Sequence, residues 1–304
     1  MRTTSVATRT TTPRLAVRER IDFFPYLLIA PTLILILGLT VVPAVYALIM
    51  SLSEVDYISI TRFVGLANYA NVLSDPETLT NVVVTLKFVG ASIVGYVIIA
   101  FCLAIILNQK VVARSFFRTV VLIPWVTTQV VSTLVVKWML DFDLGIVNST
   151  LRGLGLDPVS FLSDPHNALL TLVGITVWRA SPYGMVLLLA GLQTVPGELY
   201  EAAAVDGANA LRRFLSITVP LIRGPMLIML VMESMGMVSL VTPILVLTGG
   251  GPGNATDVLA LRLFQEAFIN FNMGTGATIA MLIFGLDIVL SVVYIGLLHQ
   301  RGDG

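Results

Sequence analysis

Residues 82–107 read VVVTLKFVGASIVGYVIIAFCLAIIL, and Lys87 is the one charged residue among them. The hydrocarbon core of a bilayer is roughly 30 Å thick, and a helix of about 20 apolar residues crosses it. This stretch is therefore long enough and apolar enough to form a membrane-spanning helix. Further stretches of the same character follow or precede it: 23–50, 120–140, 168–192, 220–247 and 277–298.

The composition of the whole chain agrees with many membrane spans. Of the 304 residues, 56% are hydrophobic and 12% are charged, whereas a soluble domain carries roughly 25% charged residues. A soluble fold of this length cannot bury so much apolar surface. The sequence therefore predicts an all-α polytopic protein of the cell membrane with about six transmembrane helices.

The distribution of Lys and Arg predicts the orientation, because cytoplasmic loops collect these residues. The leader, the second and fourth loops and the tail contain twelve of them: Arg2, Arg9, Arg14, Arg18, Arg20, Lys110, Arg114, Arg118, Arg212, Arg213, Arg223 and Arg301. The alternate loops contain three, namely Arg62, Arg152 and Arg262. We therefore expect both termini to be cytoplasmic, with a disordered leader over 1–20 and a transmembrane domain over 21–304.

Several kinds of site are disfavoured by the residue inventory. Cys102 is the single cysteine, so the chain can form neither an internal disulfide nor a cysteine-based metal cluster. His166 and His299 are far apart in sequence and lack the paired spacing of a zinc site. The 18 basic and 18 acidic residues leave no net charge that would favour nucleic acid. We predict no metal site, no catalytic residue and no nucleic-acid partner.

The fourth loop carries the most informative motif. It reads Glu201-Ala202-Ala203-Ala204-Val205-Asp206-Gly207, then nine residues, then Ile217-Thr218-Val219-Pro220. Small side chains followed by a glycine predict a short helix with a closely approachable surface and a break after it. Proline suits the first turn of the next helix because its missing N–H is not needed there. The pattern predicts a compact helical element, 197–220, joined to a membrane span.

This pattern resembles the Glu-Ala-Ala segment of permeases from binding-protein-dependent ABC importers. That segment reads Glu-Ala-Ala, three residues, Gly, nine residues, Ile, one residue, Leu-Pro, and the present chain departs from it only at Val219. Three further stretches are similar to the carbohydrate-uptake branch, which includes the permeases for maltose, lactose and glycerol-3-phosphate. They are Phe63-Val64-Gly65-Leu66-Ala67-Asn68-Tyr69, Leu122-Ile123-Pro124 and Leu247-Thr248-Gly249-Gly250-Gly251-Pro252.

The resemblance implies a fold, a function and a set of partners. The fold is that of a type I ABC importer permease, and the Gly-Gly-Pro feature is similar to the first of the two permeases in such systems. The implied partners are a second, related permease, two ATPase subunits, an extracytoplasmic solute-binding protein, membrane lipid and a sugar-like solute. The chain itself holds no cofactor, since ATP and Mg²⁺ belong to the ATPase. The implied coupling residues are Glu201, Ala202, Ala203, Asp206 and Gly207.

Charged residues inside the expected spans mark a second candidate site. A charge at the bilayer centre costs roughly 2.5–3.5 kcal/mol on insertion scales. We expect Lys87 and Lys137 to snorkel from near the outer ends of their spans, and Asp287 to stabilise helix packing. Arg179 and Glu233 lie deeper and need a partner or a solute.

Helical spacing supplies the neighbours of the two deep charges. It places Thr176, Arg179 and Tyr183 on one face, and Glu233, Gly236, Met237 and Leu240 on another. Both faces are expected to line one cavity, since in the maltose permease of this family the sugar lies at mid-membrane between the corresponding helices.

The role of the two charges stays open between direct solute contact and a structural Arg179–Glu233 ion pair. The maltose permease has uncharged residues at the positions of Arg179 and Glu233, and an arginine also suits phosphate or carboxylate. Trp125, Trp138 and Trp178 could stack on a sugar, although tryptophan is enriched at membrane interfaces anyway. A self-contained secondary transporter is the alternative function, but it does not explain the Glu-Ala-Ala segment.

Overall fold

The computed structural model describes residues 24–109 and 112–299. The expected leader over 1–20 and the basic tail residue Arg301 lie outside the described residues. The chain divides into two units, Met1–Tyr46 and Ala47–Gly304, and each is described by itself.

The N-terminal unit is built from one apolar helical stretch. Helix α1 (Phe24–Ile36) continues through a π-helical turn, Leu37–Val41, into α2 (Val42–Ser51), whose second half belongs to the larger unit. Residues Leu27–Ser51 are long and apolar enough to cross a membrane. This agrees with the span expected over 23–50.

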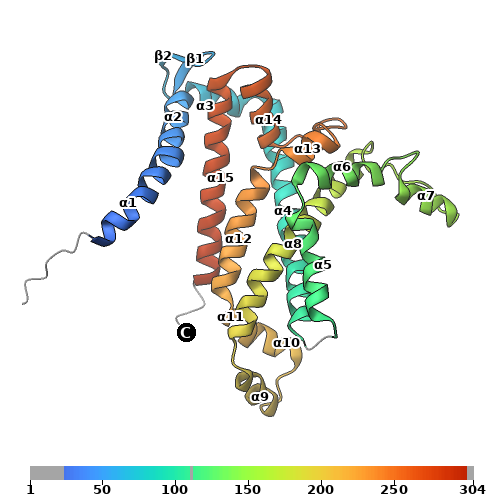
Figure 1. The fold of residues 1–304 in the computed structure, drawn as a ribbon. Helices are drawn as coiled ribbons and strands as arrows, with labels where there is room; N and C mark the ends of the chain where they lie inside the picture. Colours follow the sequence, from blue (N-terminus) through green and yellow to red (C-terminus); the bar gives the residue numbers. More distant parts are fainter. Residues whose placement is uncertain (1–23, 110–111, 300–304) are drawn as a thin grey trace, which may run out of the picture. The chain divides into compact units, whose positions relative to one another are not determined.

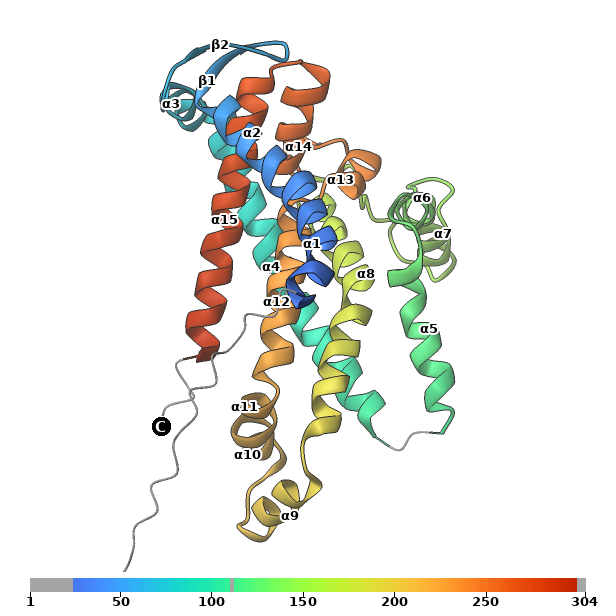
Figure 2. The ribbon, with the colours of Figure 1, turned by 60° about the vertical axis from the view of Figure 1, so that its left-hand side comes forward.

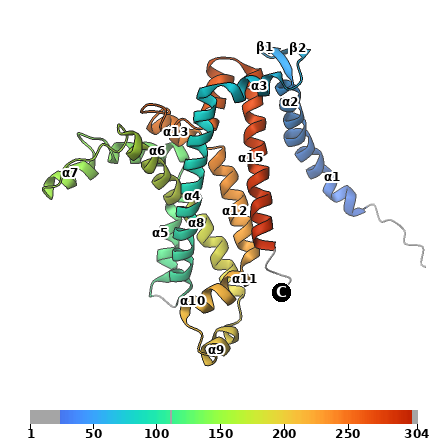
Figure 3. The same ribbon diagram turned by 180° about the vertical axis from the view of Figure 1, so that it is seen from behind.

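The larger unit contains a short hairpin and a group of long helices (Figure 1). The hairpin pairs β1 (Ser53–Asp56) with β2 (Ser59–Phe63) in antiparallel register. The helices are α3 (Ala67–Ser74), α4 (Pro76–Asn108), α5 (Arg114–Val126), α6 (Gln129–Met139), α7 (Ile146–Gly153), α8 (Pro165–Thr194), α9 (Gly197–Val205), α10 (Ala210–Arg213), α11 (Val219–Leu221), α12 (Arg223–Val238), α13 (Thr242–Leu247), α14 (Leu259–Phe264) and α15 (Met273–His299). Figure 3 shows α4, α8, α12 and α15 side by side.

The helical prediction is confirmed in its main part, and the hairpin is an addition to it. Within residues 24–109 and 112–299, four helices are long and apolar enough to span a membrane: Leu27–Ser51, Pro76–Asn108, Pro165–Thr194 and Met273–Leu298. Two bent helix pairs raise the number to six if each pair is one span. The predicted number of spans therefore holds only when the bent pairs are counted.

The third expected span, 120–140, is not a straight helix. Helices α5 and α6 meet at an angle of 96°, and Figure 2 shows α5 from the side with α6 almost end-on. Thr127 and Thr128 at the joint both have extended backbone, and Pro124, one turn earlier, has no N–H for the helical ladder. The uniform apolar character of 120–140 hides this break.

The fifth expected span, 220–247, is also interrupted. Helix α12 ends at Val238, and α13 begins at Thr242 with Pro243 in its first turn. A second bend, of 74°, separates Ala210–Leu221 from Arg223–Val238. The apolar stretch that looked like one helix is therefore two helices with an irregular connection between them.

Two long helices begin with the same cap. An aspartate accepts hydrogen bonds from the first free backbone N–H groups, and a proline follows: Asp75 before α4 and Asp164 before α8. A hydrogen bond from the Thr78 hydroxyl lowers the pKa of Asp75 from its usual value. Because the folded pKa is lowered, the cap adds stability at neutral pH that is lost as the pH falls through that pKa.

Arg262 of α14 links the N-terminal end of α4 to α14. Its guanidinium forms ion pairs with Asp75 at 3.5 Å, Glu77 at 2.9 Å and Glu266 at 3.4 Å. Its side chain is only 18% exposed, so solvent weakens this network less than an isolated surface pair. The ends of α4 and α14 are therefore held together by charge as well as by packing.

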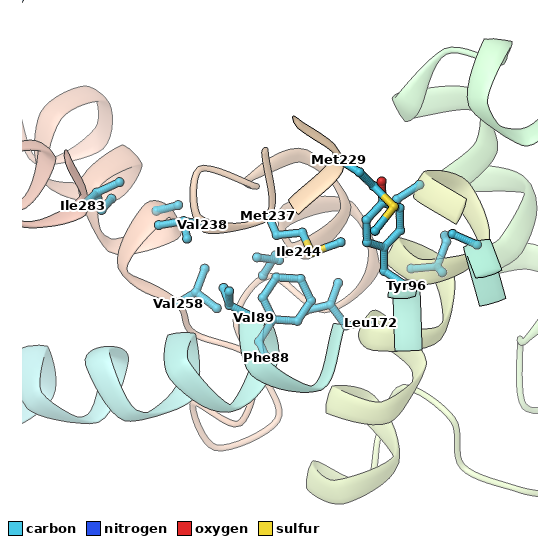
Figure 4. Packing of buried hydrophobic residues seen from close by; sticks show 14 of the residues in the cluster. Phe88, Val89, Tyr96, Leu172, Met229, Met237, Val238, Ile244, Val258 and Ile283 are labelled. Atoms are coloured by element: carbon cyan, nitrogen blue, oxygen red, sulfur yellow. The ribbon is translucent and has the colours of Figure 1, made fainter. Parts of the chain in front are cut away.

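The core of the larger unit lies between α4 and α8. Phe88 and Tyr96 of α4 and Leu172 of α8 are fully buried, and Figure 4 shows them among side chains from neighbouring helices, including Met237 of α12. The close approach depends on Gly184 of α8. A Cβ atom there would lie 2.7 Å from the Tyr96 hydroxyl oxygen and 2.9 Å from the Ala100 Cβ.

We expect Gly184→Val to lower the melting temperature of the detergent-solubilised protein. Overpacking typically costs about 1–3 kcal/mol, and here the clash involves both a ring and a small residue. Gly174→Val is the matched control, because Gly174 lies on the same helix and a Cβ there meets nothing within 4 Å. Equal melting temperatures for the two variants would contradict the tight α4–α8 packing.

Candidate solute cavity and coupling segment

A cavity of about 230 Å³ lies between the bent helix pairs of the larger unit. Helices α5, α6, α8, α12 and α13 all contribute to its wall. Its lining residues are Trp125, Gln129, Thr133, Ile175, Thr176, Arg179, Ala180, Glu233, Gly236, Met237, Leu240 and Pro243.

Six of the seven residues expected from helical spacing line this one cavity. They are Thr176, Arg179, Glu233, Gly236, Met237 and Leu240. The seventh, Tyr183, is not part of the wall, but its ring stacks on that of Trp125 with centroids 5.5 Å apart and planes inclined by 21°. The spacing argument therefore brings the right faces of α8 and α12 together.

Sequence reasoning named Trp125 of α5 as a residue that could stack on a sugar, but it missed the wall contributed by α6. It treated 120–140 as one straight helix, so Gln129 and Thr133 had no reason to face α8. The bend after Val126 turns α6 across the end of α5 and places both residues at the cavity. Pro124 followed by Thr127-Thr128 was the available signal for a break.

Arg179 and Glu233 share the cavity without pairing. Among the described residues, no ion pair within 4.0 Å joins them, although an ion pair was one of the two roles expected for them. The Nε atom of Arg179 is buried and has no hydrogen-bond partner in the described part of the chain. Each side chain is therefore available to a third group.

The threonines of the wall have already used their protons. The Thr133 hydroxyl donates to the Gln129 carbonyl oxygen at 2.7 Å, and the Thr176 hydroxyl donates to the Leu172 carbonyl oxygen at 2.8 Å. A hydroxyl that donates to its own helix keeps acceptor lone pairs only. At these two positions the cavity therefore presents acceptors rather than donors.

Lys137 lies in the last turn of α6, near the end of its helix, and its head group is hydrogen-bonded. Its Nζ donates a hydrogen bond of 2.6 Å to the carbonyl oxygen of Val246, near the C-terminal end of α13, where the helix dipole favours a cation. The bond joins α6 to α13. Both helices also contribute to the cavity wall, so Lys137 fixes one part of the wall to another.

Asp287 lies in a different cavity, of about 320 Å³, whose other lining residues include Ser239, Val241, Ile283 and Phe284. It is 7% exposed, and its Oδ1 atom has no hydrogen-bond partner among the described residues. No hydrogen bond or ion pair of Asp287 is seen within the part of the chain that the structure describes, and the packing role expected for it stays a prediction.

The Glu-Ala-Ala segment folds as the short helix α9 followed by a sharp reversal. Gly207 has a φ of +75°, which L-residues adopt only with strain. Its N–H donates to the Ala204 carbonyl at 3.1 Å, and the N–H of Ala208 donates to the Ala203 carbonyl at 2.9 Å. This is a Schellman ending, and it explains why the motif requires glycine there.

One side-chain contact connects this helix to the segment before α11, and a local cap orders α10 between them. The hydroxyls of Tyr200 and Thr218 lie 2.9 Å apart, and Thr218 is buried in the turn before α11. Asn209 caps α10 by accepting the Arg212 N–H at 2.8 Å. The Tyr200–Thr218 contact thus ties α9 to the residues just before α11.

The outer surface of α9 is open to a partner. Glu201, Ala202, Asp206 and Gly207 are exposed and Ala203 is half-buried. In the larger unit, α9 lies at the opposite end from the β1–β2 hairpin (Figure 1).

Over the described residues, no group of three or more His, Cys, Asp or Glu side chains could hold a metal ion.

A match over residues 82–301 identifies the family. These residues match the model of the binding-protein-dependent transport system inner membrane component, so the chain belongs to that family. It is a multi-pass inner-membrane permease subunit of an ABC importer, and the family expected from the Glu-Ala-Ala segment is confirmed.

Individual relatives are similar in sequence to this chain over almost its whole length. The trehalose/maltose transport system permease protein MalF of Thermococcus litoralis is 36% identical over 279 residues, covering 91% of this chain and 94% of the relative. The sn-glycerol-3-phosphate transport system permease protein UgpA of Agrobacterium fabrum is 31% identical over 287 residues, covering 91% and 95%.

Solved structures support the fold. A chain of a bacterial alginate ABC transporter, crystallised in complex with an alginate pentasaccharide-bound periplasmic protein, superposes with a TM-score of 0.79. The match covers 93% of this chain and 96% of that chain at 20% identity. At this identity the likeness concerns the fold alone.

Proposed function

We propose that this permease carries a sugar or a related polar solute across the membrane through the cavity between α5, α6, α8, α12 and α13. The observation that carries the proposal is the convergence of Arg179, Glu233, Gln129 and two threonines on one cavity inside an apolar helical protein. Polar groups inside a membrane are costly and usually mark a solute or ion pathway. The relatives named for trehalose/maltose and sn-glycerol-3-phosphate support a polyhydroxylated cargo.

The partners follow from the same assignment. The chain pairs with a second, related permease, receives solute from an extracytoplasmic binding protein, and is driven by two ATPase subunits that hold ATP and Mg²⁺. Helix α9, with Glu201, Ala202, Ala203, Asp206 and Gly207, docks on an ATPase subunit. Its exposed small side chains and its position at one end of the larger unit support this role.

This docking defines the orientation. The end of the protein that carries α9 faces the cytoplasm, as do both termini, and the β1–β2 hairpin faces outward. The positive-inside distribution of the loops supports this assignment, because Arg212, Arg213 and Arg223 all lie beside α9 in sequence.

The mechanism is alternating access by movement of connected helices. Closure of the ATPase subunits displaces α9, and the Tyr200–Thr218 contact passes the displacement to α12. Helix α12 carries Glu233, Gly236 and Met237 on the cavity wall. The same movement therefore changes which side of the membrane the solute groups face.

Site-specific cross-linking tests the docking of α9. Cys102 is the only cysteine, so one substitution, Cys102→Ala, gives a cysteine-free background. In that background Ala202→Cys, treated with a thiol-reactive cross-linker in native membranes, should link to an ATP-binding subunit. The control Leu156→Cys lies in the loop after α7, 56% exposed, and should not. Linkage from Leu156→Cys alone would contradict the proposal.

A further inference from the structure

We infer that the cavity selects uncharged, hydroxyl-rich solutes and rejects anionic ones, and that Glu233 is the rejecting group. The inference rests on the proposed function, because it concerns the solute of that same cavity. It also goes further, since the names of the relatives include an uncharged disaccharide and an anionic polyol phosphate. Family membership therefore leaves the charge of the solute open.

Apart from the Arg179 guanidinium and the Trp125 indole N–H, which only donate, the polar groups of the wall are mainly acceptors. Thr133 and Thr176 present lone pairs only, because their protons are donated to Gln129 and Leu172. The Glu233 carboxylate accepts, and the Gln129 amide both accepts and donates. A phosphate or carboxylate has acceptors but no donors when fully ionised, so it would leave most of these groups without partners. A hydroxyl group donates and accepts, and it matches the wall.

Arg179, taken by itself, would favour an anionic solute. A guanidinium binds carboxylate and phosphate in bidentate fashion, and the unpartnered Nε of Arg179 shows spare donor capacity. Glu233 lines the same cavity, however, and its carboxylate repels a second negative charge placed beside it. Because the two side chains do not form an ion pair with each other, both remain free to bind separate hydroxyl groups of one neutral solute.

The aromatic residues are consistent with a ring-shaped neutral cargo. Trp125 is part of the wall and stacks on Tyr183, so one side of the cavity presents an indole held in a fixed orientation. The C–H face of a sugar ring can pack against such a surface while its hydroxyls reach the polar residues of α6, α8 and α12. Polar selection and apolar packing thus act on different faces of the same solute.

Direct binding to the assembled transporter tests the inference. The complex is purified from its native membrane through a tag on this chain, placed in lipid nanodiscs without binding protein, and titrated with matched pairs: glucose with glucose 6-phosphate, and trehalose with trehalose 6-phosphate. Saturation-transfer NMR reports weak binding of each probe. We expect the neutral member of at least one pair to bind with about tenfold lower Kd than its anionic partner.

Two variants assign the selectivity to a residue. Glu233→Gln should lower the Kd of the anionic probe by about tenfold. The Kd of the neutral probe should change less, because the amide still accepts a hydrogen bond. Asp287→Asn is the matched control: it removes a carboxylate from a separate cavity and should leave the anion preference unchanged.

Several outcomes would overturn the inference. For the wild type, these are equal or tighter binding of the anionic probes, or no binding of any neutral probe. For the variants, they are unchanged selectivity in Glu233→Gln, or a Kd for the anionic probe that falls in Asp287→Asn as much as in Glu233→Gln. Each of these leaves the proposed function standing if Ala202→Cys still cross-links to the ATPase. Loss of that cross-link, with neutral probes still preferred, would instead reject the coupling role and keep the solute selectivity.

Discussion

Gly207→Pro is expected to abolish ATP-driven uptake by the reconstituted transporter. Proline fixes φ near −65°, whereas Gly207 has a φ of +75°, and proline cannot donate the hydrogen bond that Gly207 gives to the Ala204 carbonyl. The Schellman ending of α9 is then lost. Uptake should fall more than about tenfold, since a contact that transmits movement depends on its geometry, and solute should no longer stimulate ATP hydrolysis.

The chain offers a close control for this substitution. Gly155 has a φ of +74°, and its N–H also donates to a carbonyl, that of Arg152 at 3.0 Å. Gly155→Pro introduces the same local strain after α7 rather than after α9. It should retain solute-stimulated ATP hydrolysis. If Gly207→Pro assembled with its partners and coupled normally, α9 would not be the element that transmits the movement.

Arg179→Ala is expected to raise the KM for uptake by about tenfold or more, as loss of a charged hydrogen bond to solute typically does. Basal ATP hydrolysis should stay near that of the wild type, because Arg179 lies in the cavity and not in the coupling segment. Initial uptake rates in proteoliposomes over a range of solute concentrations provide the measurement.

A surface arginine supplies the comparison for this variant. Arg62 pairs with Glu54 on the exposed hairpin, and its side chain is 73% exposed. Arg62→Ala should therefore leave KM unchanged. A KM for Arg179→Ala equal to that of the wild type would remove Arg179 from the solute site, and a structural role in the wall would remain.

The sequence predicted the parts of the fold that depend on continuous apolar runs. The spans now seen as α4, α8 and α15 could be recognised because each is a single uninterrupted helix. The two bent helix pairs could not be recognised from the sequence. Membrane proteins tolerate a helix break where it is buried in protein, and the residues around such a break are as apolar as those of a straight helix. At 120–140 the apolar pattern continues through Thr127 and Thr128, where the backbone is extended.

The cavity residues also divide into those that the sequence could predict and those that it could not. Spacing along α8 and α12 was sufficient to select Thr176, Arg179, Glu233 and Gly236, because each helix is regular over those residues. Gln129 depends on the direction of α6, which only the bend reveals. The absence of an ion pair between Arg179 and Glu233 depends on side-chain conformation, and no spacing rule contains that information.

We expect this chain to work as the permease of a multi-subunit, ATP-driven importer. The most direct test of this role is purification of the tagged chain from its native membrane, followed by reconstitution with its co-purifying subunits and measurement of solute uptake with and without ATP. We expect an ATPase and a second permease to co-purify, and uptake to require both ATP and the binding protein. Recovery of the chain alone, with uptake in vesicles that lack ATP, would contradict the account and favour a self-contained secondary transporter.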